Sequence, residues 1–162
     1  MVVDNVRSRD RIRLLNSIKT SGRDKDLCKA RRIHAYILEK ELFVKDVYIA
    51  TSLITTYAKC GALEKAREVF EQIPKPDIVT WNALIFGYAQ KGLGNEVLNC
   101  LKQMHDLGGI CPDRVTYISI LKGCGVSWSL EMGEYMDVEV RKRGLLQKDI
   151  EIGNTLVGMY SK

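Results

Sequence analysis

Residues 46–76, DVYIATSLITTYAKCGALEKAREVFEQIPKP, and residues 77–112, DIVTWNALIFGYAQKGLGNEVLNCLKQMHDLGGICP, decide the fold because they are two versions of one pattern. Each contains two apolar stripes at helical spacing, and a glycine, Gly61 or Gly92, separates the stripes. Glycine tolerates the positive φ that commonly ends a helix. Each stretch is therefore predicted to form a helix-turn-helix hairpin. Aligned at their first aspartates, the two stretches match at the following apolar positions: Leu53, Ile54, Tyr57, Ala66, Phe70 and Ile73 with Leu84, Ile85, Tyr88, Val97, Leu101 and Met104.

The same pattern extends over nearly the whole chain. Five aspartates, at separations of 36, 31, 36 and 36 residues, begin the repeats: Asp10, Asp46, Asp77, Asp113 and Asp149. At a shift of 103 residues, LCKARRIHAYILEKELFVKD lies over LEMGEYMDVEVRKRGLLQKD, so the first and fourth units share a subtype. The predicted organisation is an N-terminal extension at 1–9, a long unit at 10–45, a short unit at 46–76, a standard-like unit at 77–112, a long unit at 113–148 and a truncated short unit at 149–162.

Stacked hairpins bury their apolar stripes against neighbouring hairpins, which a single hairpin cannot do. The predicted fold is all-α, a right-handed α-solenoid of helix-turn-helix hairpin repeats. Pro74, Pro76 and Pro112 are expected to end second helices, and Gly125 is expected to end a first helix in the same way as Gly61.

Composition excludes several classes of protein. The chain has 46% hydrophobic and 28% charged residues, with a formal net charge of +5, which is globular and mildly basic. No apolar run is long enough for a membrane span, and no targeting segment is visible in the first residues. The five cysteines lack metal-ligand spacing and are expected to be reduced core thiols: Cys28, Cys60, Cys100, Cys111 and Cys124.

The mixed unit lengths, together with VTWNALIFGYAQKG, SLITTYAKCGALEKAREVFEQIPKPD and KARRIHAYILEK, resemble the plant PLS subclass of pentatricopeptide repeat proteins. The tetratricopeptide repeat is the competing interpretation, but its uniform period of about 34 residues and its Trp-Leu-Gly-Tyr signature are absent. The resemblance implies binding of single-stranded RNA, with one base per repeat read by the fifth residue and the residue that ends the unit.

For this decoding, counting starts at the residue after each aspartate, so the next aspartate is the residue that ends the unit. Under that resemblance, Thr51 with Asp77 implies guanine, and Asn82 with Asp113 implies uracil, with cytosine second. Asn154 in the truncated unit implies a pyrimidine. The long units offer Leu15 and Ile118, whose aliphatic side chains cannot hydrogen-bond a base. The predicted track, from 5′ to 3′, is one unspecified base, G, U or C, one unspecified base, then a pyrimidine.

The resemblance also implies supporting contacts. The second residue of each unit would pack on base faces, and these residues are Ile12, Tyr48, Val79, Val115 and, as an acidic departure, Glu151. Basic residues at the thirteenth position would contact phosphates, and these are Arg23, Lys59 and Lys162, with Gln90 as the exception.

No catalytic residue, metal site, cofactor or small-molecule substrate is expected. The His-x-Glu and Cys-x-x-Cys elements of a deaminase are absent. The family implies a mitochondrial or chloroplast protein whose partners are an organellar transcript and the cofactors of RNA processing or C-to-U editing. A protein-binding or peptide-binding scaffold is the alternative function.

Structural roles compete with the functional ones. The unit-starting aspartates, Asp10 and Asp46 above all, could serve only as helix N-caps. His34, Trp81 and Trp128 are expected to pack between helices, and the basic segment around Arg141 is expected to be a solvated face.

Overall fold

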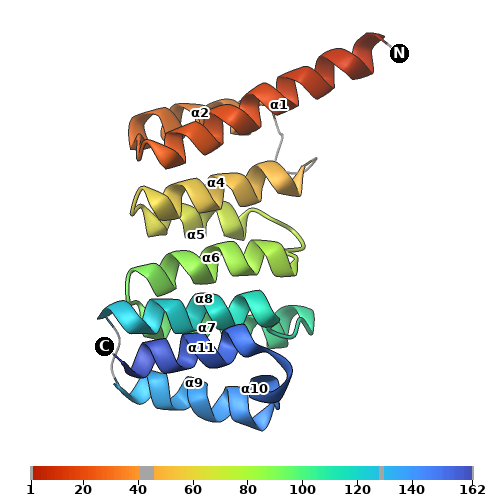
Figure 1. The fold of residues 1–162 in the computed structure, drawn as a ribbon. Helices are drawn as coiled ribbons and strands as arrows, with labels where there is room; N and C mark the ends of the chain where they lie inside the picture. Colours follow the sequence, from red (N-terminus) through yellow and green to blue (C-terminus); the bar gives the residue numbers. More distant parts are fainter. Residues whose placement is uncertain (1, 41–45, 128–129, 162) are drawn as a thin grey trace. The chain divides into compact units, whose positions relative to one another are not determined.

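The computed structural model describes residues 2–40, 46–127 and 130–161, and every secondary-structure element in these ranges is a helix (Figure 1). The chain divides into two compact units, Met1–Pro76 and Asp77–Lys162. Both units consist of antiparallel helical hairpins, so the predicted all-α helical-hairpin repeat fold is confirmed.

The first unit contains two hairpins. Helix α1 (Val2–Arg23) packs against α2 (Leu27–Glu39), and α4 (Val47–Lys59) packs against α5 (Leu63–Glu71). The hairpins meet mainly through their first helices, because α1 also lies along α4 (Figure 1). The predicted stripes form the core of this unit, with these side chains buried: Leu15, Ile18, Ala30, Ile37, Leu53, Ile54, Tyr57, Ala66, Val69 and Phe70.

A close approach joins α1 to α4. The Thr56 hydroxyl donates a hydrogen bond to the Ile18 carbonyl at 3.0 Å, and a Cβ placed on Gly22 would lie 2.9 Å from the Thr56 hydroxyl oxygen. A side chain at Gly22 would therefore force the two helices apart. Nearby, the His34 ring meets the Tyr57 hydroxyl at 3.0 Å between Nδ1 and Oη, so His34 packs between helices as expected.

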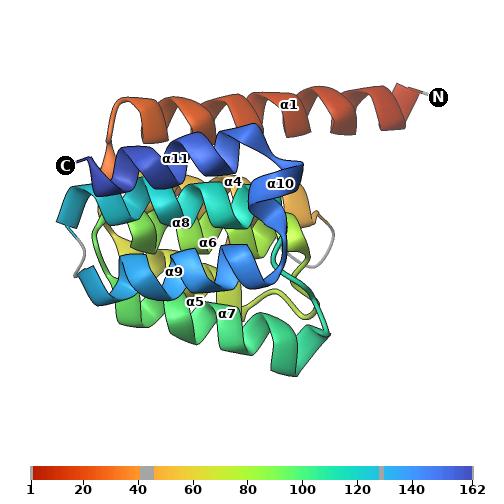
Figure 2. The ribbon, with the colours of Figure 1, turned by 60° about the horizontal axis from the view of Figure 1, so that its bottom comes forward.

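The second unit contains two further hairpins and the first helix of another. The hairpins are α6 (Ile78–Gln90) with α7 (Gly94–Gly108), and α8 (Arg114–Ser127) with α9 (Leu130–Lys142). The short α10 (Leu145–Lys148) leads into α11 (Ile150–Tyr160). Helix α8 lies between α6 and α11 and contacts both, so the first helices of this unit form one layer (Figures 1 and 2). Trp81 is only 3% exposed, which matches the expected packing role.

Aspartates begin four of the first helices. Asp46, Asp77, Asp113 and Asp149 each accept a hydrogen bond from a backbone N–H two or three residues later, which satisfies a donor that the helix itself cannot pair. The predicted capping role is confirmed at these positions. At the other end of the first helices, Gly61 and Gly92 have φ of 77° and 69°, as the predicted turns require.

Several expectations are wrong. Asp10 begins no helix, because α1 starts at Val2 and continues through it. Gly125 does not end a helix either, since α8 extends to Ser127. Gly109, with φ of 56°, ends α7 before Pro112 is reached. The side chain of Cys124, like residues 128 and 162, lies outside the described residues.

The cysteines are not all core residues. Cys100 is buried, but Cys28 and Cys111 are exposed and Cys60 is half-buried. Cys28 lies in the first turn of α2, and Cys111 lies in the loop before α8.

Candidate nucleic-acid interface

Asn82 and Asp113 come together as the repeat register predicts. Asn82 lies in the second turn of α6, and Asp113 precedes α8, the first helix of the next hairpin. The Asn82 Nδ2 amide donates to Asp113 Oδ1 at 3.1 Å. The fifth residue of one unit therefore contacts the residue that ends it.

Thr116 completes this cluster. Its hydroxyl oxygen lies 2.6 Å from Asn82 Oδ1 and 2.8 Å from Asp113 Oδ1. Its backbone N–H donates to Asp113 Oδ1 at 2.9 Å, and its hydroxyl accepts from the Asp113 N–H at 3.1 Å. This reciprocal arrangement is a capping box that also holds a neighbouring helix. We call Asn82, Asp113 and Thr116 the polar triad.

The polar triad fixes which way the amide of Asn82 points. A carboxylate can only accept, so Nδ2 faces Asp113 and Oδ1 faces the Thr116 hydroxyl. Asn82 is 8% exposed and Thr116 is fully buried, whereas Asp113 is exposed. One amide N–H and one lone pair of Oδ1 of Asn82 are not used within the triad, and the Asp113 carboxylate is exposed.

Hydrogen bonds keep Asp113 charged. Burial raises the pKa of the carboxyl, but the bonds donated by Thr116 and by the Asn82 amide outweigh burial and hold this pKa below its ordinary value. The charge is therefore maintained by neutral donors.

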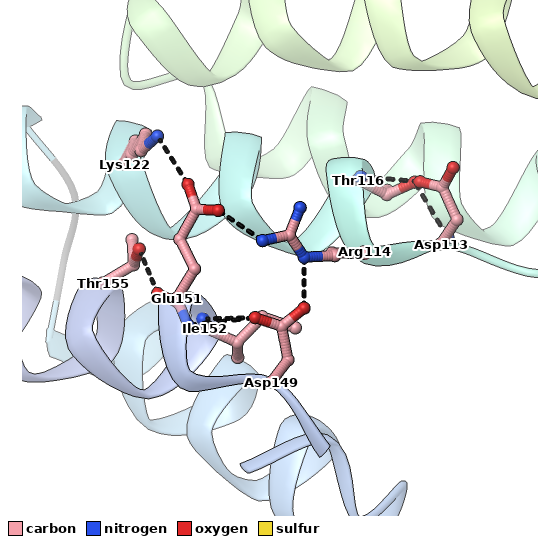
Figure 3. Close-up of polar contacts among 8 residues, drawn as sticks. All are labelled: Asp113, Arg114, Thr116, Lys122, Asp149, Glu151, Ile152 and Thr155. Carbon is pink, nitrogen blue, oxygen red and sulfur yellow. Dashed lines mark hydrogen bonds and ion pairs between the residues drawn. The ribbon is translucent and has the colours of Figure 1, made fainter.

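Asp46 and Asp149, which end the two long units, are held differently. Arg11 Nη2 donates to Asp46 Oδ1 at 3.1 Å while Nε contacts Oδ2, and this guanidinium holds the pKa of Asp46 below its ordinary value. Arg114 contacts Asp149 and also Glu151 (Figure 3). Burial raises the pKa of Asp149, but the Arg114 contact and backbone N–H donors lower it overall.

The other predicted reading residues are placed as follows. Asp77 accepts from the Thr80 N–H at 2.8 Å and from its hydroxyl at 2.7 Å. The Thr51 hydroxyl donates to the Val47 carbonyl at 2.9 Å. Because Thr51 and Asp77 belong to different compact units, their pairing stays a prediction. Asn154 is exposed on α11 and lines an open hollow with Lys122 and Glu151.

The second residues of the units are apolar yet exposed. The exposed fractions are 54% for Ile12, 64% for Tyr48, 56% for Val79 and 51% for Val115. An exposed apolar side chain thus recurs at the second position of each of these repeats. Glu151, at the same position in the last unit, is engaged by Arg114 and lies 3.5 Å from Lys122 Nζ.

The predicted phosphate contacts lie on the surface. Arg23 is exposed in the last turn of α1, where Nε lies 3.0 Å from Asp24 Oδ1. Lys59 is exposed in the last turn of α4, and Gln90 is exposed at the end of α6. Lys162 lies outside the described residues. The basic segment near Arg141 forms ion pairs with acidic residues of α9, Arg141 with Asp137 and Arg143, just after the helix, with Glu139.

Four contributors were missed by sequence reasoning: Thr80, Thr116, Arg11 and Arg114. A signal for them exists in the repeats. Threonine follows Asp77 and Asp113 by three residues, whereas isoleucine follows Asp46 and Asp149 at that place. Arginine stands first only in the two long units. Comparing units by subtype would have separated these positions.

The described residues contain neither a metal-binding cluster nor a membrane-spanning helix. No group of three His, Cys, Asp or Glu side chains is placed to hold a metal ion in the part of the chain that the structure describes. Among the described helices, none is long and apolar enough to cross a membrane.

Comparisons with known proteins agree with the repeat geometry. Residues 76–125 match the model of the PPR repeat family, and residues 48–76 match that of the PPR repeat. Three similar relatives are pentatricopeptide repeat-containing proteins of Arabidopsis thaliana. A chloroplastic one is 31% identical, covering 90% of this chain and 23% of the relative. Two mitochondrial ones are 43% and 42% identical, covering 64% and 71% of this chain and 14% and 13% of each relative.

The chain spans 12% to 27% of the length of the curated relatives it matches. Repeat length, helical hairpins, capping aspartates and these matches all agree, and the chain belongs to the pentatricopeptide repeat family.

Proposed function

We propose that this chain binds single-stranded RNA through the exposed side chains of its first helices, as part of an organellar RNA-processing or C-to-U editing factor. The observation that carries the proposal is the polar triad, in which a buried amide is oriented beside an exposed carboxylate. In this proposal the chain recognises a site on the RNA and carries out no catalytic step.

The chemistry of the triad suits a pyrimidine. The amide N–H of Asn82 that lies outside the triad and the second lone pair of its Oδ1 can pair with either pyrimidine, because both present a donor beside an acceptor. This pairing alone does not separate the two bases. We propose uracil first and cytosine second, in the order that the family resemblance implies.

Val79 and Val115 supply the packing. They are exposed on α6 and α8, helices that contact one another, and would cover the two faces of the base that the triad reads. Tyr48 would stack on a base in the same manner, a contact worth about 1 to 3 kcal/mol. Arg23 and Lys59 would contact phosphates. We extend the same proposal to the PLS order of the units, to guanine at Thr51 with Asp77 and to a pyrimidine at Asn154.

The comparisons support an organelle as the site of action. Relatives are named chloroplastic or mitochondrial, and we propose one of these compartments for the protein. A chain of about four units reading two or three bases would bind weakly, so we propose that further units of a longer protein share the work.

Base swaps in a short RNA test the proposal. Fluorescence anisotropy would compare an RNA carrying G followed by U with RNAs in which the U alone, or both bases, are adenine. We expect the U-to-A change to weaken binding about 5-fold to 150-fold, the equivalent of about 1 to 3 kcal/mol.

Asn82→Ala should remove that preference, whereas Asn95→Ala, an exposed asparagine on α7, should keep it. Equal affinity of the wild-type chain for all RNAs would show that the decoding is wrong. Affinity that does not fall between about 50 and about 200 mM salt would instead favour a peptide-binding scaffold.

A further inference from the structure

One ion pair recurs in the two long units. Arg11 contacts Asp46 and Arg114 contacts Asp149, each across a separation of 35 residues. The two pairs are related by the shift of 103 residues at which the sequence repeats. In each, the first residue of a long unit contacts the aspartate that ends the same unit.

The arginine also reaches the second residue of the following unit. The Arg11 guanidinium carbon lies 6.0 Å from the centre of the Tyr48 ring, and Arg114 Nη2 contacts the Glu151 carboxylate (Figure 3). Both guanidinium groups therefore occupy the same place, between the unit-ending aspartate and the position proposed to pack on a base.

The standard-like unit lacks this device. Its first residue is Ile78, and its ending Asp113 accepts from Asn82 and Thr116 instead. In the long units the residue three places after the aspartate is Ile49 or Ile152, which has no hydroxyl. Each of the three aspartates, Asp46, Asp113 and Asp149, thus accepts side-chain hydrogen bonds either from an arginine or from the other two members of the polar triad, and none accepts from both.

We propose that Arg11 and Arg114 are specificity-determining residues that tie down the ending aspartate of each long unit, so that it cannot orient a fifth residue or accept from a base. This inference rests on the proposed function. On this inference, the long units lack a base preference because of their first residue as well as because of the aliphatic Leu15 and Ile118.

A phosphate site is the poorer interpretation of these arginines. Around Arg114, two cations, Arg114 and Lys122, meet two carboxylates, Asp149 and Glu151 (Figure 3). The local charge sums to zero, so no excess positive charge remains for a phosphate. The two arginine side chains are about half exposed, at 48% and 54%, and ion pairs made by such exposed groups contribute little to stability. An effect on base selection is therefore the sharper expectation to test.

The decisive comparison keeps or removes only the arginine. Ile118→Asn with Ile152→Thr installs the polar residues of the standard-like unit while Arg114 stays. Adding Arg114→Ile copies the first residue of that unit. The measurement is the U-over-A preference at the nucleotide directly 3′ of the one assigned to Asn82, with circular dichroism to verify folding.

We expect less than a 2-fold preference for the double variant and about 5-fold or more for the triple variant. An equal preference in both variants, or none in the folded triple variant while the wild-type chain prefers U at the Asn82 nucleotide, would overturn the inference. If the wild-type chain shows no preference at the Asn82 nucleotide, the proposed function is wrong and the inference falls with it.

A reciprocal variant covers the case in which the triple variant does not fold. Ile78→Arg places the arginine in the standard-like unit, and Ile78→Leu is its matched control. We expect Ile78→Arg to lose the U preference at the Asn82 nucleotide while binding RNA, and Ile78→Leu to keep it. An unchanged preference in a folded Ile78→Arg chain would overturn the inference.

Discussion

Two aspartates lie next to the same helix, α8, and behave differently. Asp113 caps α8 and accepts from a buried amide and a hydroxyl, whereas Asp149 caps α11 and is held by Arg114 from the first turn of α8 (Figure 3). Both have a lowered pKa, the first through neutral donors and the second with help from a guanidinium. The contacts of a unit-ending aspartate are therefore not determined by the aspartate alone. They depend on the first residue of the unit that it ends, which is Arg114 for Asp149, and on the residue three places after it, which is Thr116 for Asp113.

The largest expected effect comes from removing the hydroxyl of the polar triad. Thr116→Val removes the buried hydroxyl that faces Asn82 Oδ1 and Asp113 Oδ1, and it leaves the largely buried amide oxygen of Asn82 without that donor. We expect a loss of about 1 to 3 kcal/mol in the free energy of unfolding, measured by urea denaturation, together with a loss of the U preference. Ile152→Val is the matched control at the other junction, with an expected loss of about 0.5 to 1.5 kcal/mol. A smaller loss for Thr116→Val than for this control would contradict the stabilising role of the triad.

Capping should give the next largest effect. Asp113→Ala removes the acceptor for the Thr116 N–H and is expected to cost about 0.5 to 2 kcal/mol. Asp113→Asn should restore most of this loss, because asparagine caps as well as aspartate. The same pair of substitutions at Asp46 should behave alike in urea denaturation, since the cap is common to both junctions. If Asp46→Asn is as destabilising as Asp46→Ala, the Arg11 contact rather than the cap holds α4.

The smallest expected effect is that of salt on the pKa of the aspartates, which should differ between an aspartate held by an arginine and one held by neutral donors. In the folded chain, Asp46, Asp113 and Asp149 all have a lowered pKa. Such groups stabilise the fold above their unfolded pKa, and this contribution is lost as the pH falls through the folded pKa. At about 1 M salt, where the Debye length is about 3 Å, the pKa of Asp46 should rise toward its ordinary value. The pKa of Asp113 should change less, because its donors are neutral, and NMR titration of the carboxyl carbons measures both. Equal salt shifts at the two sites would remove the distinction.

Much of the fold was predictable because its signals are local. Asp77 and Asp113 each directly follow a proline, which cannot continue a helix, and each begins a helix as predicted. No proline or glycine precedes Asp10, and α1 therefore runs through it. Gly125 shows the converse, since a glycine inside a helix costs only about 1 kcal/mol relative to alanine and does not by itself end the helix.

The candidate site was predictable in part for a different reason. Asn82 and Asp113 follow from counting within a unit, and the structure brings them together. The Arg11 and Arg114 contacts join residues 35 positions apart, and nothing in the local pattern around either arginine indicates its partner. Only the repetition of the whole contact 103 residues later makes it visible.

The double duty of the unit-ending aspartates has a consequence for redesigning the repeats. Each of these residues is both a base-facing side chain in the proposed code and the N-cap of the next helix. The residue types that can be substituted at that position are therefore limited to those that cap a helix well, namely aspartate, asparagine, serine and threonine. Any residue outside that set would change the base preference of the unit and, at the same time, destabilise the following hairpin.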